Sequence, residues 1–279
     1  MPDDYKPLTD YGVVGDGRTA ALIARDGAVD WLCLPQFDSP SHFAALLDVA
    51  RGGRWTVRPN GAFVSCAEYI PDTNVLTTTF ESGSAAARLT DFMPRGTRQP
   101  VLCRKLESIN GAMTFECRIE ARPNYGRRRA PVESLTVEVA PGKPAWLAYP
   151  REAAPRNLSS GQGDRLLEKT IAYWREWASR IQYDGPYRGE VTRSALALKL
   201  LIHEPTGAPV AAATTSLPEW IGGERNWDYR YSWVRDSCYM LGALVELGYL
   251  EETRSYLRWL AEVAPKRRPL PVMFDLKGR

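Results

Sequence analysis

The spacing of the apolar residues changes once along the chain, and this change constrains the fold more than any other feature. Up to about residue 150, short apolar runs are separated by Gly and Pro at short intervals, as in antiparallel strands packed in a sandwich. From Asp164 onward the apolar residues recur at the spacing of helices. The sequence therefore predicts a β-domain followed by helices.

One hairpin in the first half is marked by its turn. Apolar runs at 20–25 and 28–34 flank Asp26-Gly27, a dipeptide that favours a two-residue hairpin turn. Further strands are expected at 54–58, 74–80, 86–91, 101–109 and 113–121, and residues 135–139 and 145–149 are expected to form the last pair.

The second half predicts four helices after a linker at 150–163 that is rich in Pro, Ala, Ser and Gly. They are expected from Asp164, over 188–202, from Val234 to about Leu247, and from Glu251 onward. The third is apolar almost all round, which predicts burial on every side. The expected domains are a β-sandwich at 1–150, a linker and linker helix at 151–186, and a helical domain at 187–279.

Composition excludes several classes of protein. The chain has 44% apolar and 25% charged residues and a net charge of +3, so its short basic runs at 127–129 and 266–268 indicate solvated loops rather than nucleic-acid binding. It has no apolar stretch of membrane-spanning length and no visible signal peptide, so a cytoplasmic protein is expected. Its five scattered cysteines indicate neither disulfides nor zinc, and Cys33 and Cys238 are expected to be buried.

A run just before the third helix combines aromatic rings with charged side chains. Residues 225–237 read Arg-Asn-Trp-Asp-Tyr-Arg-Tyr-Ser-Trp-Val-Arg-Asp-Ser, shortly after Gly222-Gly223. Ring faces stack on the apolar face of a pyranose, and fixed charged groups bind its hydroxyls. The run therefore indicates a sugar pocket.

Two blocks carry a resemblance to a known family. Residues 214–219 and the run that follows resemble the start of the catalytic domain in glycoside hydrolase family 15, which contains glucoamylases, glucodextranases and bacterial trehalase-like enzymes. Residues 10–22, 26–35 and 37–40 resemble the trehalase-like N-terminal domain that precedes many bacterial members. Together the resemblance covers most of residues 5–123 and 164–265.

The resemblance implies a fold and roles for four residues. It implies an antiparallel, supersandwich-like β-domain, a linker helix and the first helices of an (α/α)6 toroid that hydrolyses α-glucosidic bonds with inversion. By motif match, Arg235 and Asp236 would bind the hydroxyls of the sugar in the −1 subsite, and Tyr229 and Trp233 would line or stack on its ring. No metal and no organic cofactor are expected.

The roles of Arg235, Asp236 and Trp233 have structural alternatives. Arg235 and Asp236 could form an ordinary ion pair at a helix start, where an acidic residue is favourable in any case. Core packing is the alternative for Trp233, and it is the favoured interpretation of Trp227 and Tyr231.

The sequence departs from the family pattern in two places. Family β-domains usually carry additional strands where this chain passes directly from Gly126 to Leu135. An incomplete sandwich is therefore one of the expected outcomes. The family's general acid and general base are glutamates that lie farther along the toroid than Arg279, so no catalytic residue is expected here. Glu219 and Glu224 are poor substitutes because both lie on one segment, whereas catalysis needs carboxyls on opposite faces of the bond.

Other motifs give no function. The run from Gly15 to Ala20 matches a loose dinucleotide fingerprint, but a hairpin rather than a helix is expected to follow it. His203 is followed by Glu204-Pro205 and no second histidine, so a zinc helix is not indicated. His42 is the only other histidine, which leaves little material for nucleophilic catalysis.

The sequence thus predicts the N-terminal portion of an inverting α-glucoside hydrolase, inactive alone, whose substrate would be trehalose or a malto-oligosaccharide. The alternative is a non-catalytic truncated paralogue that binds glycans or associates with a full-length relative through its open toroid. Neither a nucleic acid nor a membrane is expected as a partner.

Overall fold

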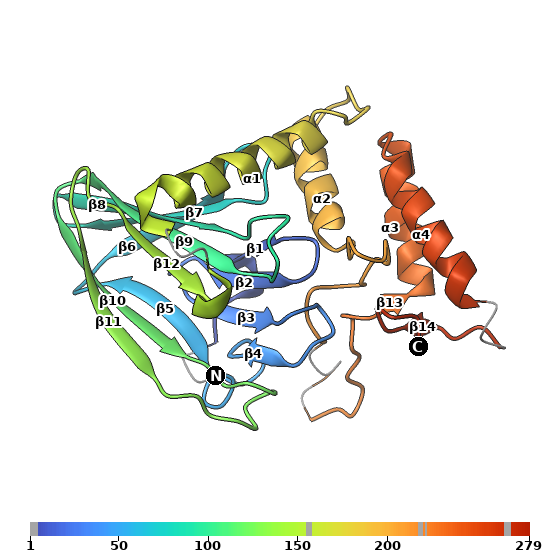
Figure 1. Ribbon diagram of the computed structural model, residues 1–279, viewed down its shortest axis with the longest axis horizontal. Coiled ribbons are helices and arrows are strands. Elements are labelled where there is room, and N and C mark those ends of the chain that lie inside the picture. Colours follow the sequence, from blue (N-terminus) through green and yellow to red (C-terminus); the bar gives the residue numbers. More distant parts are fainter. Residues whose placement is uncertain (1–4, 155–157, 217–219, 221, 265–268) are drawn as a thin grey trace.

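The computed structural model describes residues 5–154, 158–216, 220, 222–264 and 269–279. Its N-terminal part is a sandwich of two antiparallel sheets (Figure 1). The larger sheet has the order β1-β2-β3-β5-β10-β11, with β4 paired to β3, and the smaller has the order β12-β9-β8-β7-β6. The strands of the larger sheet are β1 (Tyr11–Gly15), β2 (Ala20–Ala24), β3 (Val29–Cys33), β4 (Ser41–Phe43), β5 (Arg54–Pro59), β10 (Met113–Glu120) and β11 (Glu133–Val139). Those of the smaller sheet are β6 (Val64–Tyr69), β7 (Leu76–Ser82), β8 (Ala85–Phe92), β9 (Leu102–Asn110) and β12 (Ala145–Tyr149).

The expected hairpin at Asp26-Gly27 is confirmed. Strands β2 and β3 pair antiparallel, with Ala21 opposite Leu32. Gly27 has a φ of +79°, a backbone conformation that a residue without Cβ adopts at no steric cost. The same glycine lies against the sandwich interior, because a Cβ there would meet the Phe80 ring at 3.0 Å.

The structure corrects the expected last strand pair. Strand β11 pairs with β10 in the larger sheet, whereas β12 pairs with β9 in the smaller sheet. The two are consecutive in sequence but diverge after the tight turn at Ala140–Lys143, so they form facing edges of the sandwich. The local sequence pattern predicts both β11 and β12 but does not indicate which sheet each of them joins. Strands β1, β4 and β6 were not among the sequence expectations.

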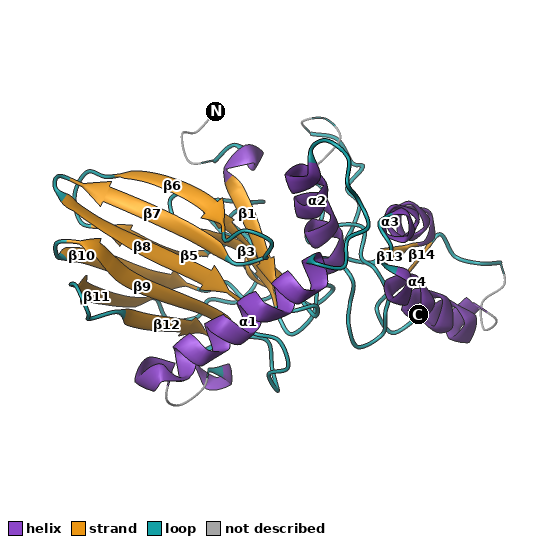
Figure 2. Cartoon of the chain, turned by 90° about the horizontal axis from the view of Figure 1, so that it is seen from above, coloured by secondary structure: helices purple, strands orange, loops and turns teal. Residues whose placement is uncertain are grey.

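All four expected helices are present in the described part of the chain: α1 (Gly163–Ala178), α2 (Arg188–Leu200), α3 (Val234–Glu246) and α4 (Leu250–Val263). Shorter turns occupy η1 (Leu8–Asp10), η2 (Arg151–Ala153) and η3 (Leu158–Gln162), and a two-stranded ribbon pairs β13 (Ser232–Trp233) with β14 (Met273–Phe274). Figure 2 shows the sandwich at one end of the molecule and α3 and α4 at the other, with α2 between them and α1 running alongside the sandwich.

Helix α1 packs on the smaller sheet and joins the two halves. Its buried Trp174 and Trp177 share one apolar core with Val75 and Phe92 of the sandwich and with Leu241 of α3. At the start of α1, a salt bridge of 3.0 Å joins Asp164 Oδ1 to Lys105 Nζ of β9. Sheet and helices therefore share a continuous apolar core.

The expectation that α3 is buried on every side is wrong. Met240, Leu241 and Leu244 are buried, but Tyr239 is 76% exposed and Val245 is 37% exposed. Cys238, expected inside, is also exposed, whereas Cys33 is buried as expected. Helix α3 thus contacts the described part of the chain with one face only. None of the described helices is both long and apolar enough to cross a bilayer.

Candidate functional site: the segment that leads into α3

The segment between α2 and α3 folds back on itself before the helix begins. Ala211 and Ala212 donate backbone hydrogen bonds to the carbonyls of Tyr231 and Tyr229, at 3.1 and 2.8 Å. Farther out, Ser216 Oγ accepts from the Trp227 amide at 2.7 Å. This hairpin-like path carries the aromatic and charged run to the N-terminus of α3. The candidate residue Glu219 lies outside the described residues, and Glu224 is exposed.

The four residues singled out from the sequence lie together. The rings of Tyr229 and Trp233 have centroids 5.9 Å apart, and the guanidinium carbon of Arg235 is 5.9 Å from the Trp233 ring. Arg235 Nη2 and Asp236 Oδ2 are 3.0 Å apart. The four side chains therefore form one continuous chain of contacts. Trp227 extends it, with its ring edge-to-face with Trp233 at 6.2 Å.

The positions of these side chains follow from how α3 begins. Trp233 precedes the helix in an extended conformation, and its indole Nε1 donates to the carbonyl of Asp228 at 2.9 Å. On its backbone side Trp233 pairs with Met273 in the β13–β14 ribbon. Asp236 lies in the first helical turn, where the helix dipole favours a negative charge.

Arg235 and Asp236 therefore bind each other in this structure, which is the arrangement expected for an ion pair at a helix start. Neither is enclosed: the side chain of Arg235 is 67% exposed and that of Asp236 is 33% exposed. An exposed pair of this kind contributes about 0–1 kcal/mol, so a ligand that offers hydroxyl groups exchanges for it at little cost. The ion pair and a sugar-binding role are thus compatible.

Arg230 is the important residue that the sequence expectations left without a role. Its guanidinium is buried and donates to Asp228 twice, from Nε to Oδ1 at 2.9 Å and from Nη2 to Oδ2 at 2.7 Å. Nη2 also reaches Tyr125 Oη at 2.7 Å, and Nη1 donates to the Ser39 carbonyl at 2.7 Å. These last two partners belong to loops of the sandwich, about 100 and 190 residues away in sequence. Arg230 thus holds the site segment on the N-terminal domain.

Further contacts join the same two parts of the protein. Trp31 Nε1, in β3, donates to the carbonyl of Ala213 at 2.9 Å. The amide of Leu276, just after β14, donates to Asp38 Oδ2 at 3.3 Å. No local pattern indicates these contacts, because each joins residues more than 180 positions apart.

Other motifs have structural roles in the fold. Gly15 to Ala20 form the turn between β1 and β2, which was not expected, and the Asp16 carboxylate accepts from the amide of Thr19 at 3.1 Å. The β2–β3 hairpin, rather than a helix, follows this run, as expected. His203 Nδ1 lies 2.8 Å from Thr206 Oγ1, and His42 Nδ1 lies 2.8 Å from Tyr149 Oη. Over the described ranges, no group of three or more His, Cys, Asp or Glu side chains is placed to hold a metal ion.

Comparison with known proteins confirms the family resemblance of both halves of the chain. Residues 185–278 match the model of glycosyl hydrolases family 15, and residues 2–140 match that of the trehalase-like N-terminal family. A trehalase from Thermoplasma volcanium is 36% identical over 98% of this chain and 50% of its own length. A trehalase from Mycolicibacterium smegmatis is 33% identical over 100% of this chain and 51% of its own length. The chain thus spans about half the length of these curated relatives.

A solved structure shows the same fold. A bacterial glucoamylase complexed with acarbose superposes with a TM-score of 0.67 at 12% sequence identity, over 100% of this chain and 53% of that one. Its likeness covers both the sandwich and the four helices described here.

The match of residues 185–278 to a glycosyl hydrolase family model, on a β-sandwich joined through a buried core to antiparallel helices, places this chain in the glycoside hydrolase class. The chain belongs to glycosyl hydrolase family 15 and carries a trehalase-like N-terminal domain.

Proposed function

We propose that this chain is the N-terminal portion of an inverting α-glucoside hydrolase of the trehalase or glucoamylase type, acting in carbohydrate metabolism. The observation that carries the proposal is the chain of contacts from Tyr229 through Trp233 and Arg235 to Asp236 at the start of α3. We further propose domain limits of 1–150 for the sandwich, 151–186 for the linker region and 187–279 for the helical part.

In this proposal the four residues form one half of a −1 glucose subsite. The Asp236 carboxylate accepts from two sugar hydroxyls, and Arg235 donates to a third through its planar guanidinium. The rings of Trp233 and Tyr229 contact the apolar face of the pyranose. The substrate class is an α-glucoside such as trehalose or a malto-oligosaccharide, in agreement with relatives named trehalase and a structural neighbour that binds acarbose.

Hydrolysis itself requires two more groups. Inversion uses a protonated carboxyl at the leaving oxygen and an ionised carboxylate that activates water, about 6.5–9.5 Å apart across the bond. We propose that both lie beyond Arg279 in the family's toroid, so residues 1–279 bind the sugar weakly and do not cleave it.

Calorimetric titration with acarbose tests the binding site. Asp236→Asn is expected to weaken binding by tenfold or more, since a hydrogen bond to a charged group contributes about 1.5–3 kcal/mol. Asp184→Asn is the matched control, because Asp184 is fully exposed near the start of α2, away from the aromatic run. Equal affinity of Asp236→Asn and the unmodified chain would refute the assignment.

A glucose-release assay with trehalose and with maltose tests the second half of the proposal. No glucose is expected from the chain that ends at Arg279. Release that disappears in Asp236→Asn would show that these residues already contain a complete catalytic set.

A second candidate function is a non-catalytic protein that binds glycans or associates with a full-length relative. The exposed face of α3 favours it, because Tyr239 and Val245 present apolar surface of the kind that interaction sites use. Sedimentation velocity over a range of concentrations, alone and with the relative, distinguishes the two. If the chain sediments as a single monomeric species and its sedimentation does not change when the relative is added, the proposed association is refuted.

A further inference from the structure

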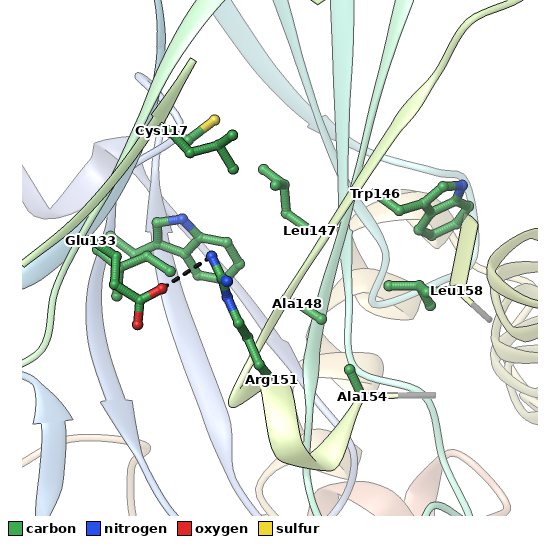
Figure 3. A pocket seen from close by; sticks show the side chains of 11 residues that line it. Cys117, Glu133, Trp146, Leu147, Ala148, Arg151, Ala154 and Leu158 are labelled. Atoms are coloured by element: carbon green, nitrogen blue, oxygen red, sulfur yellow. Dashed lines mark ion pairs between the residues drawn. The ribbon is translucent and has the colours of Figure 1, made fainter. Parts of the chain in front are cut away.

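A pocket opens at the side of the sandwich, away from the segment that leads into α3. Strands β11 and β12 are the outermost strands of their sheets at this side, and the pocket of about 320 Å³ lies between them. Figure 3 shows Glu133 and Arg151 joined by their ion pair on one side of it and Trp146 beside Leu158 on the other. Its volume is at the lower end of the range for small-molecule sites, roughly 300–1,000 Å³.

The wall of this sheet-edge pocket is mostly apolar. Leu135 of β11 and Leu147 of β12 line it from the two sheets, and Trp55 of β5 and Trp146 of β12 add indole rings. Leu135 is 41% exposed, whereas most apolar side chains that point between the sheets are covered. Aromatic and aliphatic surface of this kind favours an apolar ring.

The charges at the pocket neutralise one another. Arg151 Nη2 and Glu133 Oε2 are 3.0 Å apart, and both side chains are at least half exposed. Glu152 follows directly in sequence, so no excess positive charge is present to hold an anion. Burial of an unpaired charge costs several kcal/mol, so the pocket favours an uncharged molecule.

Trp55, one of the residues that line the pocket, has a hydrogen-bond donor without an acceptor in the described part of the chain. Trp55 is 1% exposed, and its Nε1 has no hydrogen-bond partner among the residues that the structure describes. Its ring is held in place by the Arg104 guanidinium, 4.7 Å from the ring centroid, and Arg104 is itself fixed to Asp91 at 2.6 Å. A buried donor without an acceptor is unfavourable by about 1–3 kcal/mol, so an acceptor that reaches it gains affinity.

We propose that the sheet-edge pocket binds a small uncharged molecule with an apolar ring body and one hydrogen-bond acceptor, which receives the indole N–H of Trp55. The site is separate from the proposed glucoside subsite, and its occupancy needs no catalytic residue. A ketone-bearing aromatic compound represents this chemistry.

Fluorescence titration with the neutral naphthyl ketone Prodan tests the proposal. We expect saturable one-site binding with blue-shifted emission. Leu135→Trp, a substitution that an exposed strand position tolerates, is expected to fill the pocket and to weaken binding at least tenfold. Tyr239→Ser on the exposed face of α3 is expected to change nothing, which separates the pocket from other apolar surface. Absence of saturable binding, or full affinity in Leu135→Trp, overturns the proposal.

The role of the indole N–H is tested by Trp55→Phe with Trp174→Phe as its matched control. Both tryptophans are buried with an unpartnered Nε1, but only Trp55 lines the pocket. Prodan affinity is expected to fall roughly threefold to tenfold in the first variant only. Should Trp55→Phe fail to fold, competition in the unmodified chain replaces it: 2-acetylnaphthalene must displace Prodan better than 2-ethylnaphthalene. If the two naphthalenes displace Prodan equally, or if Trp55→Phe and Trp174→Phe lose Prodan affinity equally, the hydrogen bond from Trp55 to the ligand is refuted.

Discussion

Arg230 and Asp228 lie two residues apart and form a two-point ion pair, with Arg230 only 3% exposed and in contact with the N-terminal sandwich. The pair fixes the turn that precedes Trp233, whose indole donates to the Asp228 carbonyl. The candidate sugar site is therefore positioned from two directions, by the start of α3 and by loops of the β-domain.

Arg230→Met is expected to destabilise the chain by about 3–5 kcal/mol, the usual cost of removing one partner from a buried ion pair. The comparison is Arg235→Met, whose exposed side chain predicts a change within about 1 kcal/mol. Urea unfolding followed by tryptophan fluorescence measures both. Similar midpoints for the two variants would contradict the anchoring role of Arg230.

Glu252 is expected to make stability depend on acidity. Burial opposes ionisation of this carboxyl, but Lys199, at 2.9 Å, and the Trp177 indole, at 2.8 Å, together lower its pKa below the ordinary 4.5. At a pH between the lowered pKa of Glu252 in the folded chain and its ordinary value of 4.5 in the unfolded chain, the unfolded chain binds more protons. The contribution of Glu252 to the free energy of unfolding is therefore complete above about pH 4.5 and is lost as the pH falls. Glu252→Gln should be less stable than the unmodified chain at pH 7, and the gap should narrow toward pH 3. A constant gap in unfolding free energy would contradict this.

His203 is expected to add a second dependence at higher pH. Burial, and to a smaller extent the charge of Arg18, lower the pKa of His203 from 6.5 to about 4. The folded state therefore keeps the ring neutral, and stability present above pH 6.5 is lost as pH falls to about 4, by up to about 3 kcal/mol. His203→Gln should flatten the unfolding free energy over this range. An unchanged slope would show that the ring does not titrate in this way.

The cysteines are expected to divide into two classes toward a disulfide reagent. Cys66 and Cys238 are exposed, whereas burial raises the pKa of Cys33 and Cys117 to about 11 and that of Cys103 to about 12. Because the thiolate is the reactive species, two equivalents should react quickly in the folded chain. Cys238→Ser should leave one. Five fast equivalents without denaturant would contradict the described packing.

Gly53 is expected to tolerate no side chain. It has a φ of +71°, and a Cβ there would overlap the backbone carbonyl of Glu120. Gly53→Ala should therefore cost roughly 3–5 kcal/mol, from backbone strain and overpacking together. Gly61 separates the two effects, since its φ is +89° with open space around it, so Gly61→Ala should cost only about 1–2 kcal/mol. Equal thermal shifts in the two variants would show that the overlap is relieved.

The sequence by itself determined the elements whose signals are local. Apolar spacing located α1 to α4, and the turn chemistry of Asp26-Gly27 located the β2–β3 hairpin, because periodicity and turn preferences act over a few residues. It also located the four candidate sugar contacts, since Tyr229, Trp233, Arg235 and Asp236 lie within one short run.

Only the tertiary structure decided where distant segments meet. The assignment of β11 and β12 to opposite sheets, the exposure of Cys238 and Tyr239, and the contacts of Arg230 with Ser39 and Tyr125 all depend on it. An arginine in a polar run has the same local pattern whether it faces water or joins two domains. Its role is set by partners about 100 to 190 residues away, whose positions follow from packing of the whole chain.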